Sequence, residues 1–398
     1  MMELFSAYVP SELSLFRRKS DIPITGSRKF RTPFFPHRKT NRKLAVETRQ
    51  AVMAKKKLAI EGVSEEMNAI ASQNLDFAPA RRRVRSAFFD VQQQLDHCLF
   101  KVATTGIRTE ERYERNSKGL EIFSKSWLPG PRVQIKGFLC FCHGYGDTCT
   151  FFFEGIAKRI AASGYGVYAL DYPGFGLSEG LHGYIPSFDE LVDIVVEHYR
   201  KIKGRPELRG LPCFIFGQSM GGAVTLKAHL KEPHEWDGVI LVAPMCKIAE
   251  DVKPPEPVLN FFTLLSKVMP KAKIFPTKDL AELAFRDSRK REMAVYNVLS
   301  YSDQMRLKTV VELLKATRDI ESQVEKVSSP LLILHGAADR VTDPLVSQFL
   351  YEKASSKDKT LKLYEDGYHS ILEGEPDDRI FAVLDDIITW LDARCSLN

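Results

Sequence analysis

One ten-residue stretch, residues 213–222 (Cys-Phe-Ile-Phe-Gly-Gln-Ser-Met-Gly-Gly), limits the fold of this chain more than any other. It begins with four apolar residues, a run that suits a short strand buried on both faces. A helical pattern follows, so Ser219 lies in a tight strand-to-helix turn of the form G-x-S-x-G. Side chains at Gly217 and Gly221 would collide with the neighbouring strand and helix. We therefore expect a reactive serine at the carboxyl end of a buried strand.

An acid and a histidine follow this serine, each after a strand pattern of its own. A second apolar strand pattern begins at Leu331, and the small-residue turn after it carries Asp339. A short strand pattern at residues 361–364 leads into a loop that contains His369. The order Ser219, Asp339, His369, each just past the carboxyl end of a strand, is the order of the α/β-hydrolase fold.

The rest of this domain alternates strands with helices. We expect a hairpin between residues 108 and 127, then buried strands at 137–142, 166–170 and 238–243 with helices between them. Such alternation predicts a mostly parallel central sheet flanked by helices, with the site at the carboxyl ends of the strands. The alternation pauses from about 244 to 328, which predicts a helical cap inserted after the nucleophile half.

Basic residues concentrate near the N-terminus. Residues 1–57 hold fourteen Lys and Arg against four acidic residues, whereas the remainder holds 43 basic and 47 acidic ones, so we expect no nucleic-acid partner. The composition of this leader is typical of a transit peptide, which predicts a chloroplast location; a basic tail on a cytoplasmic protein is the alternative. Residues 58–105 are expected to form a helical extension with a break near Pro79, before a hydrolase domain at 106–398. The arginines at 81, 82, 83 and 85 are expected on a solvated face, with a contact to lipid headgroups as the alternative.

The loop at residues 143–147, His-Gly-Tyr-Gly-Asp, follows a buried strand and is expected to form part of an oxyanion hole. Its donor would be the backbone N–H of Tyr145, and the second donor the N–H of Met220, next to the nucleophile. Two such donors stabilise the transition state by roughly 3 kcal/mol each. His143 is expected to brace the loop.

These motifs together resemble the monoacylglycerol lipase group of serine hydrolases, in particular the plant branch that also includes caffeoyl shikimate esterases and lysophospholipases. The resemblance covers roughly residues 108–395 and rests on the motifs at 143–147, 171–178, 217–222 and 335–339 and on His369. It implies hydrolysis of a lipid ester, monoacylglycerol foremost, with lysophospholipids or hydroxycinnamoyl esters as alternatives. The H-x4-D motif credited with acyltransferase activity in some relatives is absent, because His143 and His335 each precede their aspartate by one residue too few.

The expected chemistry uses a nucleophile, a base and an acid. His369 would take the proton of Ser219 and return it to the leaving alcohol, while Asp339 would fix the imidazole tautomer. Asp343 and Asp366 are rival acids, but Asp343 precedes a proline, as a helix N-cap does, and Asp366 lies in the histidine's own loop. Neither a metal nor an organic cofactor is expected. A non-catalytic receptor of the same fold, a thioesterase and an acyltransferase remain as rival functions.

The expected cap contains an unusually apolar helical stretch at residues 258–269. Its large apolar residues exceed what one helical face needs: Phe261, Phe262, Leu264, Leu265, Val268 and Met269. They pack the lid on the core, or they form a wall for an acyl chain or a surface that meets membrane lipid. Phe262 and Leu265 are the candidates for substrate binding. The sequence has no run of eighteen apolar residues, so no membrane span is predicted.

Overall fold

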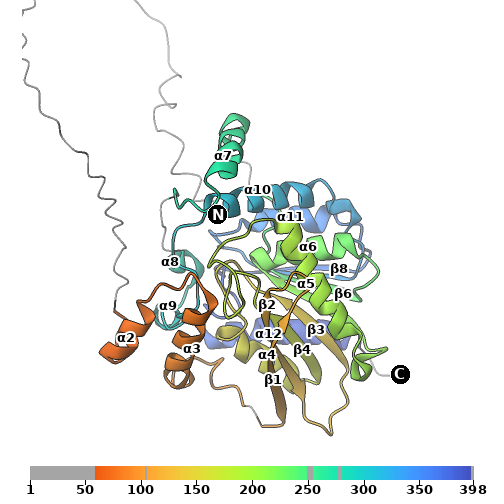
Figure 1. Cartoon of the computed structure of the whole chain (residues 1–398). Helices are drawn as coiled ribbons and strands as arrows, with labels where there is room; N and C mark the ends of the chain where they lie inside the picture. The colour runs from red at the N-terminus through yellow and green to blue at the C-terminus, as the bar shows by residue number, and fades with distance from the viewer. Residues whose placement is uncertain (1–58, 104, 249–253, 276–279, 396–398) are drawn as a thin grey trace, which may run out of the picture. The chain divides into compact units, whose positions relative to one another are not determined.

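A twisted sheet of eight strands organises the chain (Figure 1). The computed structural model describes residues 59–103, 105–248, 254–275 and 280–395, so the predicted leader at 1–57 lies outside the described residues. In sequence the strands are β1 (Ile107–Arg115), β2 (Glu121–Pro129), β3 (Gly137–Cys142), β4 (Tyr165–Leu170), β5 (Cys213–Gln218), β6 (Gly238–Val242), β7 (Leu331–Gly336) and β8 (Lys359–Tyr364). Their order in the sheet is β1-β2-β4-β3-β5-β6-β7-β8. Only the β1–β2 and β2–β4 pairs are antiparallel, so the predicted mostly parallel sheet is confirmed.

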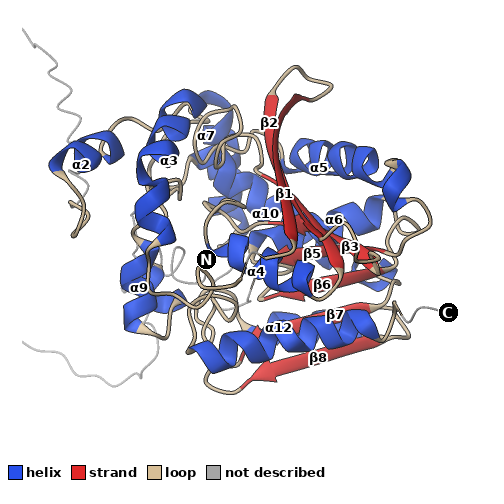
Figure 2. Ribbon diagram, turned by 90° about the horizontal axis from the view of Figure 1, so that it is seen from below, coloured by secondary structure: helices blue, strands red, loops and turns tan. Residues whose placement is uncertain are grey.

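Helices cover both faces of the sheet (Figure 2). One face carries α4 (Phe152–Ala162) and α12 (Asp377–Asp392), and the other carries α5 (Phe188–Lys203), α6 (Met220–Lys231), α10 (Leu307–Glu321) and α11 (Pro344–Lys353). Strand β3 shows why there are two cores. Phe138 and Cys140 join the cluster under α5 and α6, whereas Leu139 and Phe141 join the cluster under α4 and α12, because successive strand residues point to opposite faces.

The segment between β6 and β7 contains α7 (Glu256–Val268), α8 (Ala281–Ala284), α9 (Ser288–Ala294) and α10, followed by the 3-10 turn η4 (Val324–Lys326); a similar turn, η2 (Pro206–Leu208), precedes β5. Helix α10 is part of this insertion in sequence, but Leu313, Ala316 and Ile320 on it join the core beneath α5 and α6. The lid proper is therefore α7, α8 and α9. Among the described residues, no helix is both long and apolar enough to cross a membrane.

Helix α7 has two apolar sides. On the inner side, Leu259 and Phe262 are buried, and Leu265 packs partly buried against the same cluster; the other buried members are Phe275, Leu307, Val310 and Leu314. The outer side is exposed and carries Phe261, Leu264 and Val268, with Met269 just beyond the helix end. The inner side thus attaches α7 to α10, and the outer side remains a patch of large apolar side chains.

The N-terminal extension contains α2 (Glu65–Ala71) and α3 (Ala78–Gln93), separated by a turn. Pro79 lies in the first turn of α3, where a helix has no need of its N–H. The prediction of a solvated basic face is wrong for Arg81, whose side chain is fully buried. Its guanidinium donates to the carbonyl oxygens of Gly176 (2.6 Å), Leu75 (2.9 Å) and Ser178 (2.6 Å). Burial lowers the pKa of Arg81 to about 10, so it stays charged at neutral pH and binds the extension to the loop after β4.

All seven cysteines are buried and form no disulfide. Five of them, Cys140, Cys142, Cys149, Cys213 and Cys246, lie on or beside the sheet. Burial raises the pKa of the Cys142 and Cys246 thiols to about 12, so both are protonated and inert at neutral pH. They act as small core side chains.

Candidate active site

Ser219 occupies a strained turn between β5 and α6. Its φ is 53° and its ψ is −121°, values that an L-residue adopts only at a cost. Three backbone hydrogen bonds hold the turn: the Ser219 N–H donates to the Val242 oxygen at 3.0 Å, and the Ser219 oxygen accepts from Gly222 N (2.9 Å) and Met245 N (2.9 Å). A Cβ at Gly221 would collide with the Cys142 carbonyl. The serine is therefore fixed by close backbone packing, as its sequence motif predicts.

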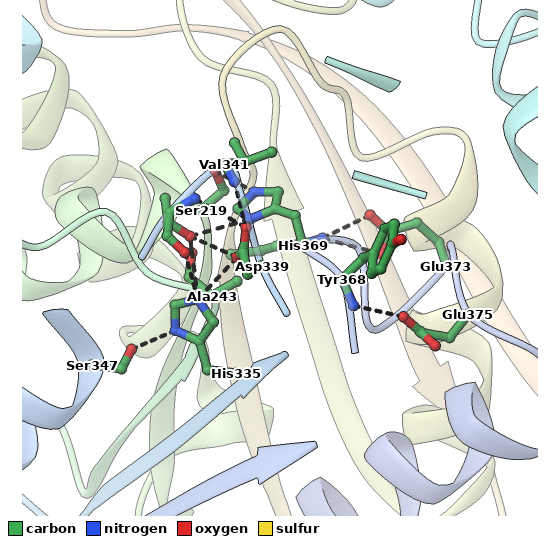
Figure 3. Close-up of polar contacts among 12 residues, drawn as sticks. Ser219, Ala243, His335, Asp339, Val341, Ser347, Tyr368, His369, Glu373 and Glu375 are labelled. Carbon is green, nitrogen blue, oxygen red and sulfur yellow. Dashed lines mark hydrogen bonds and ion pairs between the residues drawn. The ribbon is translucent and has the colours of Figure 1, made fainter. Parts of the chain in front are cut away.

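The side chains of Ser219, His369 and Asp339 form a continuous line (Figure 3). His369 Nε2 lies 3.0 Å from Ser219 Oγ, and His369 Nδ1 lies 2.7 Å from Asp339 Oδ2. The three residues follow β5, β8 and β7, whose carboxyl ends meet at one edge of the sheet. Parallel pairing thus brings together side chains that are up to 150 positions apart.

The Asp339 carboxylate is held by several donors. Its Oδ1 accepts from the backbone N–H groups of Val341 (2.7 Å) and Thr342 (3.0 Å). His335 Nε2 lies 2.9 Å from Oδ2, the oxygen that also faces His369. Burial alone would raise the pKa of Asp339, but the charge of His369 and the hydrogen bonds of His335 and His369 hold it well below its usual range. The carboxylate is therefore ionised at neutral pH, and it can stabilise an imidazolium.

The two rival acids lie elsewhere. Asp343 is the N-cap of α11, and its carboxylate accepts from the Leu345 N–H at 2.8 Å. Asp366 is exposed in the turn after β8, with a φ of 55°. Of the three candidate acids, Asp339 is the one whose carboxylate meets His369.

The two expected oxyanion donors border the serine. Met220 is the first residue of α6, so the helix leaves its N–H without an internal partner. Gly144 lies beside the serine, since a Cβ added to it would be in van der Waals contact with Ser219 Cβ at 3.5 Å, and Tyr145 follows Gly144 directly. The Tyr145 hydroxyl donates to the Gly183 oxygen at 3.1 Å. The backbone of both residues thus lies beside Ser219, and their role as oxyanion donors stays a prediction.

His143 braces this loop, as the sequence suggests. Its Nδ1 donates to the Gly144 oxygen at 2.8 Å, its Nε2 accepts from the Tyr172 N–H at 3.2 Å, and its ring stacks on Tyr172. Burial lowers the pKa of His143, so the ring is neutral and this pair of bonds defines one tautomer.

The loop that carries His369 is fixed by contacts that the sequence does not reveal. Within the loop, Glu375 Oε1 accepts from the Tyr368 N–H at 2.7 Å (Figure 3). Three bonds from the lid also reach this loop: Ser370 N to the Ala284 oxygen (2.9 Å), Arg286 N to the Gly374 oxygen (3.0 Å) and Lys290 Nζ to the Glu375 oxygen (2.6 Å). The acid-rich stretch Glu373-Gly374-Glu375 beside the histidine is the one available signal, and by itself it indicates only a polar loop.

The structure places Phe262 and Leu265 in the cluster between α7 and α10. Phe262 is 8% exposed, and its ring centroid lies 5.3 Å from that of Phe275. Of the two explanations for these residues, this placement favours packing of the lid over a wall for an acyl chain.

The strained serine turn, the eight-stranded sheet and the lid define a serine hydrolase of the α/β-hydrolase fold. The chain belongs to the family described as serine aminopeptidase, S33, which matches residues 133–377. The resemblance expected from the motifs is thereby confirmed at the level of the family.

Two relatives illustrate the range of proteins that the chain resembles. It is 35% identical over 329 residues to the caffeoylshikimate esterase of Arabidopsis thaliana, covering 82% of this chain and 97% of that protein. It is 29% identical over 283 residues to the monoglyceride lipase of Homo sapiens, covering 70% of this chain and 89% of that one. Both relatives are named for the hydrolysis of esters.

Solved structures agree on the fold. The monoacylglycerol lipase of Paleococcus ferrophilus superimposes with a TM-score of 0.60 at 24% identity, over 69% of this chain and 99% of that chain. A soluble variant of the Saccharomyces cerevisiae monoglyceride lipase, with a substrate analog, gives 0.64 at 23% identity, over 74% and 98%. The α/β-hydrolase fold predicted from the motifs is confirmed.

Proposed function

We propose that this serine ester hydrolase cleaves monoacylglycerol to a fatty acid and glycerol through an acyl-enzyme. The observation that carries the proposal is the line of hydrogen bonds from Ser219 Oγ through His369 to Asp339. Similarity to proteins named monoglyceride lipase and caffeoylshikimate esterase supports the ester as the bond cleaved.

The chemistry follows from that line. His369 Nε2 takes the proton of Ser219 as Oγ attacks the ester carbonyl, and Asp339 stabilises the imidazolium that forms. The backbone N–H groups of Tyr145 and Met220 receive the tetrahedral oxyanion. Collapse of this intermediate breaks the C–O bond, and His369 returns its proton to the leaving alcohol. A water molecule, deprotonated by the same ring, then releases the acid and restores Ser219.

The outer side of α7 supports a lipid as the substrate. Phe261, Leu264 and Val268 lie three and four residues apart, so they form one exposed stripe, on a helix that projects from α10 away from the sheet (Figure 1). A stripe of this kind can enter the interface of a membrane, where monoacylglycerol resides. We therefore include peripheral membrane contact in the proposed function.

A hydroxycinnamoyl ester is the second candidate substrate, favoured by the 35% identity to the caffeoylshikimate esterase over nearly its whole length. A lysophospholipid is the third, since it presents the same acyl ester. All three share the acyl-enzyme step and differ in the acyl group or the alcohol.

Two measurements test the proposal. Hydrolysis rates are compared for monoacylglycerols, lysophospholipids and hydroxycinnamoyl shikimate, and the monoacylglycerols are expected to react fastest. A preference for the aromatic ester would make a hydroxycinnamoyl ester, not monoacylglycerol, the proposed substrate. Ser219→Ala is expected to lower kcat by several orders of magnitude in a folded protein, and Ser219→Ala with His369→Ala to be little worse. Asp339→Asn should be severe as well, whereas Asp343→Asn, which alters only a helix cap, should leave kcat nearly unchanged. Wild-type hydrolysis by Ser219→Ala would end the proposal.

The composition of the leader supports import into a chloroplast, where this hydrolase would meet plastid lipid. The location is tested by the fluorescent fusion described in the Discussion.

A further inference from the structure

One buried carboxylate, that of Glu373, joins the two halves of the active site. The residue is 7% exposed, and its carboxylate accepts from Gln218 Nε2 at 2.8 Å (Oε1) and 3.1 Å (Oε2). Gln218 is the last residue of β5 and immediately precedes Ser219. Glu373 lies four residues after His369, in the same loop (Figure 3). This side-chain pair therefore connects the turn of the serine to the loop of the histidine.

The backbone of Glu373 is held from the opposite direction. Its carbonyl oxygen lies 2.8 Å from Nε2 of His97, a fully buried residue of the N-terminal extension. His97 Nδ1 accepts from the Leu99 N–H at 3.1 Å, and burial lowers the pKa of His97 to about 4. The ring is therefore neutral, and its one proton is on Nε2, where it donates to Glu373. The extension thus reaches the same residue that contacts Gln218.

This arrangement is a poor way to stabilise a core. Burial and the nearby charge of Asp147 raise the pKa of Glu373 to about 7, against the opposing effects of the Gln218 hydrogen bond and the charge of His369. An apolar pair of similar volume would fill the same space without the cost of removing these polar groups from water. What Gln218 and Glu373 supply, and an apolar pair lacks, is a directed bond between two catalytic segments.

We propose that Glu373 is a positioning residue that sets the separation of His369 from Ser219 through its bond to Gln218, and that His97 of the N-terminal extension holds it in place. The proposal rests on the proposed function, because it assigns His369 the role of base. A change in this separation should affect the rate strongly, because a displacement of about 1 Å between reacting groups lowers the rate on the order of a hundredfold.

The decisive variants remove the directed bond and retain the volume. In Glu373→Leu the acceptor for Gln218 is lost, and in Gln218→Met the donor is lost. We expect each to lower kcat by roughly ten- to a hundredfold on a short soluble ester, with KM within about twofold of wild type. Glu373→Gln keeps an oxygen for Gln218 Nε2 and should restore kcat to within about threefold. Because both partners serve one bond, the double variant Gln218→Met/Glu373→Leu should lose no more than either single variant.

The role of the extension has its own matched pair. His97→Asn keeps an acceptor for Leu99 N but is too short to reach the Glu373 oxygen, so kcat should fall with KM unchanged. Gln92→Leu removes a partly buried hydrogen bond of the same extension, from Gln92 Nε2 to the Tyr296 oxygen at 2.7 Å. Tyr296 lies outside the histidine loop. This variant should lower Tm and leave kcat unaltered.

All rates are divided by the concentration of reactive serine, titrated with a fluorophosphonate, so that unfolded protein does not count. The inference is overturned if Glu373→Leu turns over within twofold of wild type per titrated serine, or if the losses of the two single variants multiply in the double variant. If Glu373→Leu does not fold, Gln218→Met decides the same question. Ser219→Ala distinguishes a failure of the proposed function from a failure of the positioning role. Hydrolysis by Ser219→Ala refutes the proposed function, whereas an inactive Ser219→Ala together with fully active Glu373 variants refutes only the positioning role.

Discussion

Glu373 should make the stability of this protein fall as the pH rises through the weakly acidic range. Its pKa increases from an ordinary value of 4.5 in the unfolded chain to about 7 in the fold. Below the lower value both states hold the proton. Between the two values the unfolded chain releases the proton and the native protein keeps it, so the unfolded state binds fewer protons and the free energy of unfolding decreases with rising pH. At about 1.4 kcal/mol per pH unit, the total loss is about 3 kcal/mol, complete just above the native pKa.

Glu373→Gln has no such proton to lose. The free energy of unfolding, measured with urea at about pH 5 and about pH 8, should therefore fall by about 2.5 kcal/mol more in the wild type than in Glu373→Gln. The difference is smaller than the total loss because the wild type has already lost about 1 kcal/mol at about pH 5. Comparing the change with pH cancels any constant effect of the amide. Glu66→Gln, an exposed glutamate of α2, serves as the control and should show little change. An equal pH dependence in wild type and Glu373→Gln would refute the reasoning, because it would mean that Glu373 has the same proton affinity in both states.

Three further predictions concern other parts of the chain. Arg81→Met should lower the free energy of unfolding by about 3 kcal/mol, seen as a lower Tm, because the buried carbonyl oxygens that accept from Arg81 lose their donor. Arg83→Met, at an exposed position, should have little effect. Phe262→Ala should lower the free energy of unfolding by about 3 kcal/mol and slow the hydrolysis of esters of all acyl chain lengths alike. Phe261→Ala, at a position 59% exposed, should keep the Tm of the wild type and bind less to phosphatidylcholine vesicles in a sedimentation assay. A loss of activity in Phe262→Ala that is confined to long-chain esters would instead support the acyl-wall explanation. A fluorescent fusion of residues 1–60 should enter plastids, and fluorescence confined to the cytosol would leave only the basic-tail alternative.

The sequence is informative about the site wherever a motif coincides with a strand end. The sequence alone predicts that Ser219, Asp339 and His369 lie together, because the carboxyl ends of parallel strands meet at one edge and each residue follows such a strand. The sequence also favours Asp339 over Asp343, because a proline directly after Asp343 is typical of a helix start. These inferences depend on local pattern and topology, both of which a sequence records directly.

Burial of polar groups is where sequence reasoning fails. Arg81 lies in a run of arginines of the kind that usually faces solvent. Two of its partners are backbone carbonyls 95 and 97 residues away, and a backbone carbonyl carries no sequence signal. Glu373 is hidden for a similar reason, since nothing in its neighbours indicates that Gln218 lies within reach. For α7, both Phe261 and Phe262 are large and apolar, and only the position of α10 decides which of them is covered.

The bonds between the lid and the histidine loop limit how a substrate enters. Ala284, Arg286 and Lys290, in and around α8 and α9, each exchange a hydrogen bond with the segment that follows His369. An outward swing of α8 and α9 would pull His369, the proposed base, away from Ser219, so we expect this half of the lid to stay closed during turnover. Helix α7 is attached to α10 instead, by apolar contacts and by the pair of Arg318 and Glu256. We therefore expect substrate to enter and product to leave at the α7 end of the lid. A crosslink between α7 and α10 should slow the turnover of long-chain esters, whereas a crosslink between α9 and α12 should not.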